Sequence, residues 1–166
     1  MIQVRNLGRI SADAAGTART IGLMQEQIAS DLIDPAWRKV AMMIAPPGLA
    51  TEQRIAAMIR YVRSMRYVMD PPSHEQVQAP SYTIRKRRGD CEDLSALFAY
   101  LALIAGLRVR FATIAMAAPG VYDHIYPEIL LNDRWVPVEM IRAWPLGREA
   151  EHLEKRVWPA IKGGAV

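Results

Sequence analysis

One segment of the sequence predicts a helix that is apolar on almost every side. Its main stripe repeats every three or four residues along residues 94–105. Alanine and isoleucine cover the faces that polar residues occupy on a surface helix, so this helix has to be surrounded by protein. Gly106 follows at the position where helices commonly end in a left-handed residue. Any fold for this chain is therefore built around this helix, whose stripe consists of Leu94, Leu97, Phe98, Leu101 and Ala105.

The start of this helix carries the only cysteine of the chain. Asp90 is the predicted N-cap, and Asp93 follows at the spacing of an acidic capping box. Cys91 then lies in the first turn, where the positive end of the helix dipole lowers the pKa of a thiol. The carboxylates of Asp90, Glu92 and Asp93 act in the opposite direction, so a thiol nucleophile here needs a general base. A single cysteine also excludes an intramolecular disulfide and a four-cysteine zinc site.

Three helices are expected before this point. Residues 12–33 carry an apolar face, and residues 37–44 form a second, short helix with Pro35 near its first turn. Thr51 is the predicted N-cap of a third helix that ends near Tyr67. The sequence therefore begins with a helical region of about three elements.

The segment between the third helix and the cysteine helix has no clear period. Residues 70–88 contain several prolines and predict a long loop, which inside a compact domain is often functional. The basic run Arg85–Arg88 ends this segment. We interpret it as a solvated loop, as a docking surface for an acidic partner, or as charge compensation for Asp90, Glu92 and Asp93. The arginines of the preceding helix are expected along its solvent-exposed edge: Arg60, Arg63 and Arg66.

Three strands are predicted after the cysteine helix. They cover Val109–Ala117, His124–Leu131 and Arg134–Met140. Asn132-Asp133 separates the last two, and two such turn-forming residues between strand-like runs indicate a tight hairpin.

The remaining segments suggest a division of the chain. Residues 146–162 are expected to form a short helix, and residues 163–166 are expected to fray. We therefore predict a helical N-terminal extension at 1–50, a core at 51–145 and a C-terminal tail at 146–166.

The hairpin register brings a histidine and a carboxylate together. With Asn132-Asp133 as the two loop residues, Tyr126 lies opposite Glu139, and His124 shares the face of Tyr126. Glu139 is then diagonal to His124, within side-chain reach. A carboxylate there can hold one ring nitrogen while the other faces a thiol, which is the nucleophile, base and orienter arrangement of acyl transfer. A one-residue bulge would put Glu139 on the wrong face.

Several of these motifs together resemble the transglutaminase-like superfamily. Gly89-Asp90-Cys91-Glu92-Asp93 and the run Ala105–Phe111 look like its cysteine helix and the strand that follows. His124–Ile129 and Arg134–Glu139 look like its histidine strand and the strand with the third catalytic residue. The resemblance covers about residues 52–141, and the order Cys, His, acid is specific only in combination.

The resemblance implies a fold and three roles. The fold is α+β and papain-like, with the central cysteine helix packed on a small antiparallel sheet and a helical N-terminal extension. Cys91 would be the nucleophile, His124 the base and Glu139 the orienting acid, where the family usually has aspartate. Stand-alone members of this kind also resemble proteins encoded among phage and prophage structural genes. The resemblance implies neither a cofactor nor a metal.

The sequence identifies only one of the two donors that an oxyanion hole is expected to have. The backbone N–H of Cys91 at the helix start can supply one donor. The second is expected from the preceding segment, where the candidates are Gln76, Gln78 and Tyr82.

Two classes of function follow from these expectations. The first is an enzyme for thiol-dependent acyl transfer or for amide or peptide hydrolysis, with a protein or peptide substrate. Water as acceptor makes it a peptidase or amidase, and an amine makes it a cross-linker. The alternative is a non-catalytic structural or assembly protein on the same fold, such as a phage virion component that binds other phage structural proteins.

Net charge and hydropathy limit the kinds of partner and the location that we expect. The net charge of +4 is a mild bias and is not by itself a nucleic-acid signature. Residues 1–15 lack the apolar core of a signal peptide, and the longest apolar run, Leu94–Leu107, is shorter than a membrane span. We therefore expect no membrane contact and a cytoplasmic location, or a virion location for a phage-encoded protein.

Overall fold

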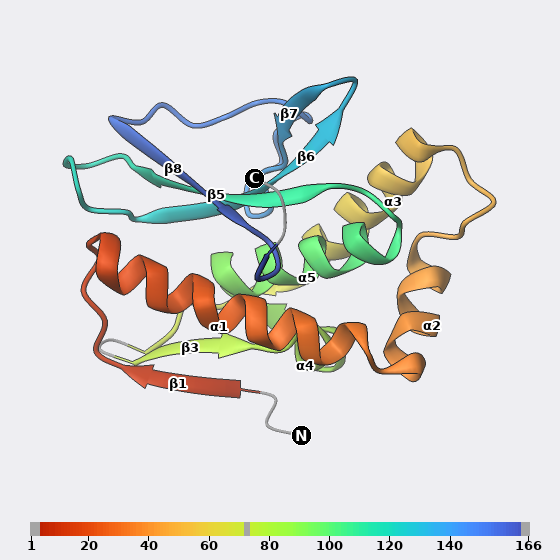
Figure 1. Ribbon diagram of the computed structural model, residues 1–166, viewed down its shortest axis with the longest axis horizontal. Coiled ribbons are helices and arrows are strands. Elements are labelled where there is room, and N and C mark those ends of the chain that lie inside the picture. Colours follow the sequence, from red (N-terminus) through yellow and green to blue (C-terminus); the bar gives the residue numbers. More distant parts are fainter. Residues whose placement is uncertain (1–3, 72–73, 164–166) are drawn as a thin grey trace.

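A four-stranded antiparallel sheet and a group of helices meet on one central helix (Figure 1). The computed structural model describes residues 4–71 and 74–163. The helices are α1 (Ala14–Leu32), α2 (Pro35–Ile44), α3 (Thr51–Arg63), α4 (Pro80–Lys86) and α5 (Cys91–Ile104). The strands are β1 (Val4–Gly8), β2 (Arg66–Tyr67), β3 (Glu75–Gln78), β4 (Arg88–Gly89), β5 (Val109–Ala115), β6 (His124–Leu131), β7 (Arg134–Pro137) and β8 (Glu154–Pro159).

The apolar helix predicted from the sequence is α5, and it lies at the centre as expected. Every residue from Asp93 to Ala102 is buried. The helix packs on β6, α1, α3 and α4. In Figure 1 the four-stranded sheet lies on one side of α5, and the β1–β3 pair lies on the other. Gly106 ends the helix with a φ of 77°, the left-handed conformation that glycine adopts without strain. The α+β fold with a cysteine helix on a small sheet is confirmed.

The hairpin between β6 and β7 has the predicted register. Asn132 and Asp133 have φ values of 48° and 59°, as in the turn type that suits a two-residue hairpin. Leu131 pairs with Arg134, and the ladder continues to Glu128 opposite Pro137.

The ladder then ends, before the predicted pair of Tyr126 and Glu139. The Val138 amide still donates to the carbonyl of Pro127, at 2.9 Å, but a proline nitrogen has no hydrogen to return. The predicted strand to Met140 is therefore too long, and Glu139 lies beyond the sheet.

The segments without a clear period hold elements that the sequence analysis missed. Residues 70–88 are not one long loop, because they contain β3, the two-turn helix α4 and β4. Such short elements do not leave a readable period. The third helix begins after the N-cap Ala50, not Thr51, and ends at Arg63, not near Tyr67.

The prediction of a short helix within residues 146–162 is wrong. This segment forms β8, which pairs antiparallel with β5 and completes the sheet order β7-β6-β5-β8. The Trp158 indole donates to the Thr113 hydroxyl of β5 at 2.9 Å, which anchors the strand. The predicted fraying of residues 163–166 concerns a segment of which all but residue 163 lies outside the described residues.

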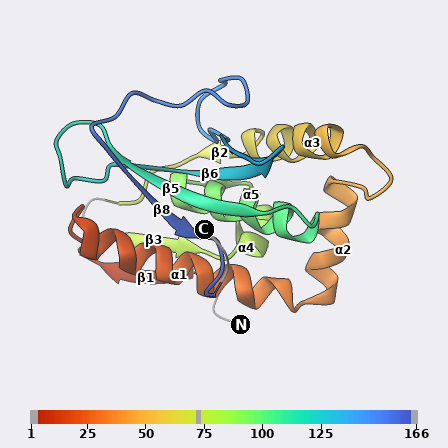
Figure 2. The ribbon, with the colours of Figure 1, turned by 45° about the horizontal axis from the view of Figure 1, so that its top comes forward.

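The N-terminal helices pack against the rest of the structure. β1 pairs antiparallel with β3, and α1 packs on α5. The Gln25 amide of α1 also donates to the carbonyl of Pro159 in β8 at 2.7 Å. Figure 2 shows α2 joining α1 to α3 at one end of the molecule. The division of the chain at residues 50 and 145 stays a prediction. In the described part of the chain, no helix is long and apolar enough to cross a membrane.

A buried carboxylate of α1 caps α4 from outside that helix. Asp31 is fully buried, and its two oxygens accept from the Ser81 amide at 2.6 Å and the Ser81 hydroxyl at 3.0 Å. The local N-cap of α4, Ala79, has no side-chain oxygen to do this. Burial raises the pKa of Asp31, and the two bonds to Ser81 oppose that shift.

We predict that Asp31→Ala lowers the free energy of unfolding by about 1–3 kcal/mol, because it leaves the buried Ser81 donors without an acceptor. Urea denaturation followed by circular dichroism measures the change. Glu26→Ala on the exposed side of the same helix is the matched control and should change stability by less than about 0.5 kcal/mol. Equal effects of the two substitutions would contradict the cap.

Candidate active site

The start of α5 places Cys91 at the first helical position, as predicted. Asp90 is the N-cap, and its side chain accepts from the Asp93 amide at 3.2 Å. In turn, the Asp90 amide donates to the Asp93 side chain at 3.4 Å. Gly89 is required just before, because a Cβ there would lie 2.5 Å from the Cβ of Asp93. The cap therefore fixes Cys91 where the helix leaves its first amides without intrahelical partners.

The Cys91 thiol is half-buried. Its sulfur donates to Glu92 Oε2 at 3.0 Å. The Ile125 amide and the Tyr67 hydroxyl lie close enough to the sulfur to influence the pKa values of the thiol and the phenol. Burial, followed by the charges of Glu92 and Asp90, raises the pKa of the thiol well above its usual value. Burial and the acidic neighbours therefore both act against the helix dipole.

His124 and Glu139 form the pair that the hairpin register predicted. His124 Nε2 lies 2.9 Å from Glu139 Oε2, and the two residues are only 6% and 3% exposed. The second carboxylate oxygen accepts from the Ile141 amide at 2.9 Å. Burial alone would raise the pKa of Glu139, but the bond to His124 and the charges of His124 and Arg142 hold it below its usual value.

The ionised carboxylate sets the tautomer of the histidine. A carboxylate only accepts hydrogen bonds, so Nε2 of His124 carries the hydrogen that points to Glu139. The other ring nitrogen, Nδ1, then keeps a lone pair and can accept a proton. The His124 ring also lies against the Tyr126 ring, with centroids 5.8 Å apart.

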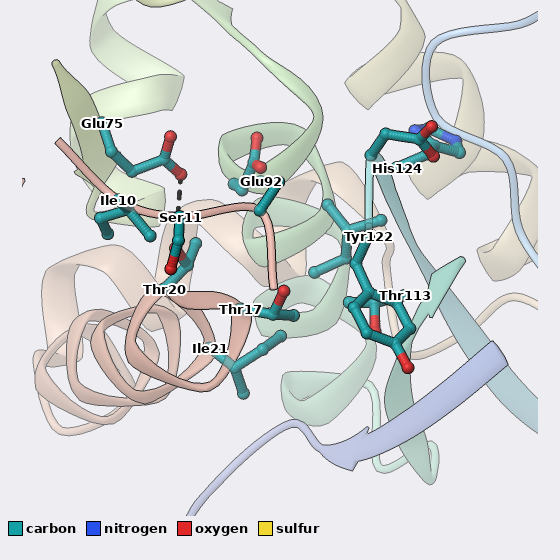
Figure 3. Close-up of a pocket in the computed structure, with 13 residues that line it drawn as sticks. Ile10, Ser11, Thr17, Thr20, Ile21, Glu75, Glu92, Thr113, Tyr122 and His124 are labelled. Atoms are coloured by element: carbon teal, nitrogen blue, oxygen red, sulfur yellow. Dashed lines mark hydrogen bonds between the residues drawn. The ribbon is translucent and has the colours of Figure 1, made fainter. Parts of the chain in front are cut away.

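The thiol and the imidazole belong to neighbouring parts of one region. Ile125, whose amide contacts the sulfur, directly follows His124. Glu92 lines both a cavity of about 350 Å³ that contains Cys91 and a second of about 150 Å³ that contains His124 (Figure 3). Among the described residues, no hydrogen bond joins Cys91 to His124, because the thiol donates to Glu92 instead.

The cavity at Cys91 is strongly acidic. Glu75 accepts from the Thr20 hydroxyl at 3.4 Å, and burial, followed by the charge of Glu92, raises the pKa of Glu75 to about 7 (Figure 3). Burial and the same neighbour raise the pKa of Asp90 to about 10. Within the described part of the chain, no three His, Cys, Asp or Glu side chains are grouped so that they could hold a metal ion.

Tyr67 is a site residue that the sequence analysis missed. It lies in β2, which pairs in parallel with β4, so that Tyr67 is opposite Gly89. Its hydroxyl thereby reaches the sulfur of Cys91, and burial and then the charge of Cys91 raise the pKa of the phenol. A pair of two-residue strands leaves no period from which this contact could be predicted.

The predicted second oxyanion donors lie elsewhere. Gln76, Gln78 and Tyr82 are not among the residues that line the cavity at Cys91, whereas Tyr67 is. The Gln78 amide donates to Asp93, and the Tyr82 ring stacks with Arg85.

Arg63 is a second missed residue. The sequence analysis placed it on the exposed edge of a helix, but it is half-buried and its guanidinium donates to the carbonyl of Glu139. The sequence does not distinguish an exposed arginine on a helix edge from one whose guanidinium is half-buried.

Known structures share this arrangement of elements. A candidate cysteine protease from Cytophaga hutchinsonii superposes with a TM-score of 0.53 and 15% identity, over 78% of this chain and 54% of the other. A candidate protease from Parabacteroides distasonis gives a TM-score of 0.56 and 7% identity, over 76% of this chain and 26% of the other. This chain thus spans from about a quarter to about half of those proteins, and the likeness shows the fold.

The sequence gives the family. No curated protein matches the chain. The sequence profile of the transglutaminase-like superfamily, however, matches residues 38–140, which include the cysteine helix, the histidine strand and Glu139. That match covers more than half of the chain, so the protein belongs to the transglutaminase-like superfamily.

Proposed function

We propose that this protein is a cysteine-dependent enzyme that transfers or hydrolyses acyl groups at amide bonds of protein or peptide substrates. The observation that carries the proposal is the buried pair of His124 and Glu139, with 2.9 Å between Nε2 and Oε2. The pair adjoins Ile125, whose amide contacts the Cys91 sulfur. A base fixed by a carboxylate next to a thiol at a helix start is the arrangement that nucleophilic catalysis requires.

The proposed roles follow from which atoms of the site can donate or accept a proton. Nδ1 of His124 takes the thiol proton, and the Cys91 sulfur attacks the carbonyl carbon of the substrate. The imidazolium then gives that proton to the leaving amine, and an acyl-enzyme remains. Water or a second amine then attacks the thioester carbonyl and loses a proton to His124. The C–S bond breaks, the acid or amide product leaves, and the imidazolium returns the proton to the Cys91 sulfur. Glu139 keeps the tautomer and stabilises the imidazolium.

Two donors are available for the oxyanion of the tetrahedral intermediate. The Cys91 amide lies in the first turn of α5, where it has no intrahelical acceptor. The Tyr67 hydroxyl is already in contact with the sulfur and lines the same cavity. We assign Tyr67 as the second donor, in place of Gln76, Gln78 and Tyr82.

The resting thiol has to change partner before it reacts. Its hydrogen points to Glu92, so Glu92 must release the thiol before His124 takes the proton. A substrate that enters the cavity of about 350 Å³ lies against Glu92 and can cause this exchange.

The same contact favours the second candidate function. A thiol held protonated by Glu92 and Asp90 suits a protein that keeps the fold as a scaffold for assembly, such as a phage structural component. We rank this function second, because a scaffold has no need of a buried His124–Glu139 pair, whose desolvation costs stability.

The first prediction of this proposal concerns turnover. Cys91→Ser should lower amide hydrolysis by about 10⁴-fold or more, since a serine hydroxyl is a far weaker nucleophile here. Glu139→Gln should cost less, because it disturbs the tautomer and leaves the nucleophile in place. Fluorescein-labelled casein measures hydrolysis, and incorporation of dansylcadaverine into casein measures transfer to an amine. Both variants should keep the far-UV circular dichroism of the parent, and a parent without turnover in either assay would favour the scaffold.

The second prediction concerns the acidity of the thiol. Glu92→Gln removes a negative charge beside Cys91, so the thiol pKa falls and the thiolate fraction at a given pH rises. We expect alkylation of Cys91 by iodoacetamide at pH 7.5 to become about tenfold faster, which corresponds to a fall of about one pKa unit. The reaction is followed by intact mass, because the chain has a single cysteine.

The exposed Glu151→Gln is the matched control and should react at the parent rate. An unchanged or slower rate for Glu92→Gln would show that Glu92 does not hold the thiol proton.

A further inference from the structure

We propose that Arg63 is the positioning residue of the site: it holds Glu139, and through Glu139 it orients His124. The inference rests on the proposed function, because it assigns a role within the same site. It concerns the backbone of Glu139, which none of the three candidate catalytic side chains fixes.

The contacts of the Arg63 guanidinium carry the inference. Arg63 is the last residue of α3, and its Nε and Nη2 donate to the carbonyl of Glu139 at 3.1 Å and 2.7 Å. Nη2 also donates to the carbonyl of Trp144 at 2.8 Å. One guanidinium therefore joins two points of the segment 139–144 to helix α3.

This segment needs support from outside the sheet. β7 ends at Pro137, and the last bond toward β6 runs from the Val138 amide to Pro127. Pro127 cannot return a bond, so the ladder does not hold Glu139 in place. In the regular part of a sheet, hydrogen bonds to the neighbouring strand would hold the backbone of such a residue. Here β7 ends two residues before Glu139, and the hydrogen bonds from Arg63 hold that backbone instead.

The other contacts of Glu139 fix its carboxylate and leave its backbone to Arg63. Oε1 accepts from the Ile141 amide, and Oε2 faces His124. Nη1 of Arg142 lies 3.7 Å from Oε2, and the Arg142 guanidinium stacks on the Trp144 ring at 4.8 Å. Ile141 and Arg142 belong to the same segment as Glu139. If the segment shifts, they move with it. Met140 and Ile141 pack in the apolar core, but among the described residues the hydrogen bonds that tie the segment to a helix are those of Arg63.

The chemistry of the side chain explains why arginine occupies this position. A guanidinium presents several donors in one plane and reaches two carbonyl oxygens at once, whereas a lysine ammonium is a point charge on a flexible stem. Removing the guanidinium would also leave the carbonyl of the buried Glu139 without its donor, at a desolvation cost. Lysine should therefore restore the charge but not the geometry.

The test compares three variants of the full chain. Arg63→Gln removes the guanidinium, Arg63→Lys keeps the positive charge, and Glu139→Gln defines complete loss of the carboxylate. Arg60→Gln is the matched control, because Arg60 is exposed on the same helix, one turn earlier. Thermal unfolding shows which variants are folded at the temperature of the measurements.

The first readout is the Nε2 hydrogen of His124 in the imidazole ¹H–¹⁵N spectrum, where its bond to Glu139 protects it from exchange with water. We expect this signal in the parent and in Arg60→Gln, and its loss or broadening in Arg63→Gln and Glu139→Gln. Arg63→Lys should weaken it. The second readout is casein hydrolysis, which Arg63→Gln should lower about 100-fold through kcat, the usual cost of a misplacement of about 1 Å.

Each outcome decides the inference. If Arg63→Gln is folded and keeps the Nε2–H signal of the parent, the positioning role is overturned. If Arg63→Gln is unfolded, a full parent signal in Arg63→Lys overturns the role instead. A weakened signal in Arg63→Lys supports it in that case. If the parent shows the signal but does not hydrolyse casein, loss of the signal in a folded Arg63→Gln supports the positioning role while the proposed function fails, so the two failures are distinguishable.

Discussion

The reciprocal cap between Asp90 and Asp93 is the contact on which the rest of the site depends. Each carboxyl accepts from the backbone amide of the other residue, and both residues are buried. The second oxygen of Asp93 accepts from the Gln78 amide at 2.8 Å, so β3 is tied to the same helix start. Because α5 is apolar on nearly every side, the core fixes its position, and the cap fixes where its first turn presents Cys91.

This way of building the helix start has an electrostatic cost. Burial, followed by the charges of Glu92 and Asp90, raises the pKa of the thiol. The helix dipole acts against them, but its influence is limited to the first turn. A raised pKa makes the thiolate scarcer at neutral pH. Under the proposed function, the buried pair of His124 and Glu139 supplies the base that such a thiol needs.

The sequence analysis could predict the parts of the site that depend on local patterns. The apolar stripe places α5, Gly89-Asp90 places Cys91, and the turn at Asn132-Asp133 sets the register of β6 and β7. Contacts between distant short elements could not be predicted. Tyr67 approaches the thiol through two-residue strands, and residues 146–162, which contain β8, lack the strict alternation that predicts a strand. Arg63 is recognised only when the packing of α3 is known.

The glutamate at position 139 is a consequence of where the sheet ends. If the ladder continued, Glu139 would lie diagonal to His124, and its side chain would be fixed by the pleat. Two prolines on neighbouring strands, Pro127 and Pro137, remove the amide hydrogens that a longer ladder would use. The chain therefore turns away after Pro137, and the longer side chain of glutamate reaches back to the imidazole from outside the strand. Its added rotatable bond has to be restrained, and the Ile141 amide, Arg142 and the Arg63 contact to its backbone provide that restraint.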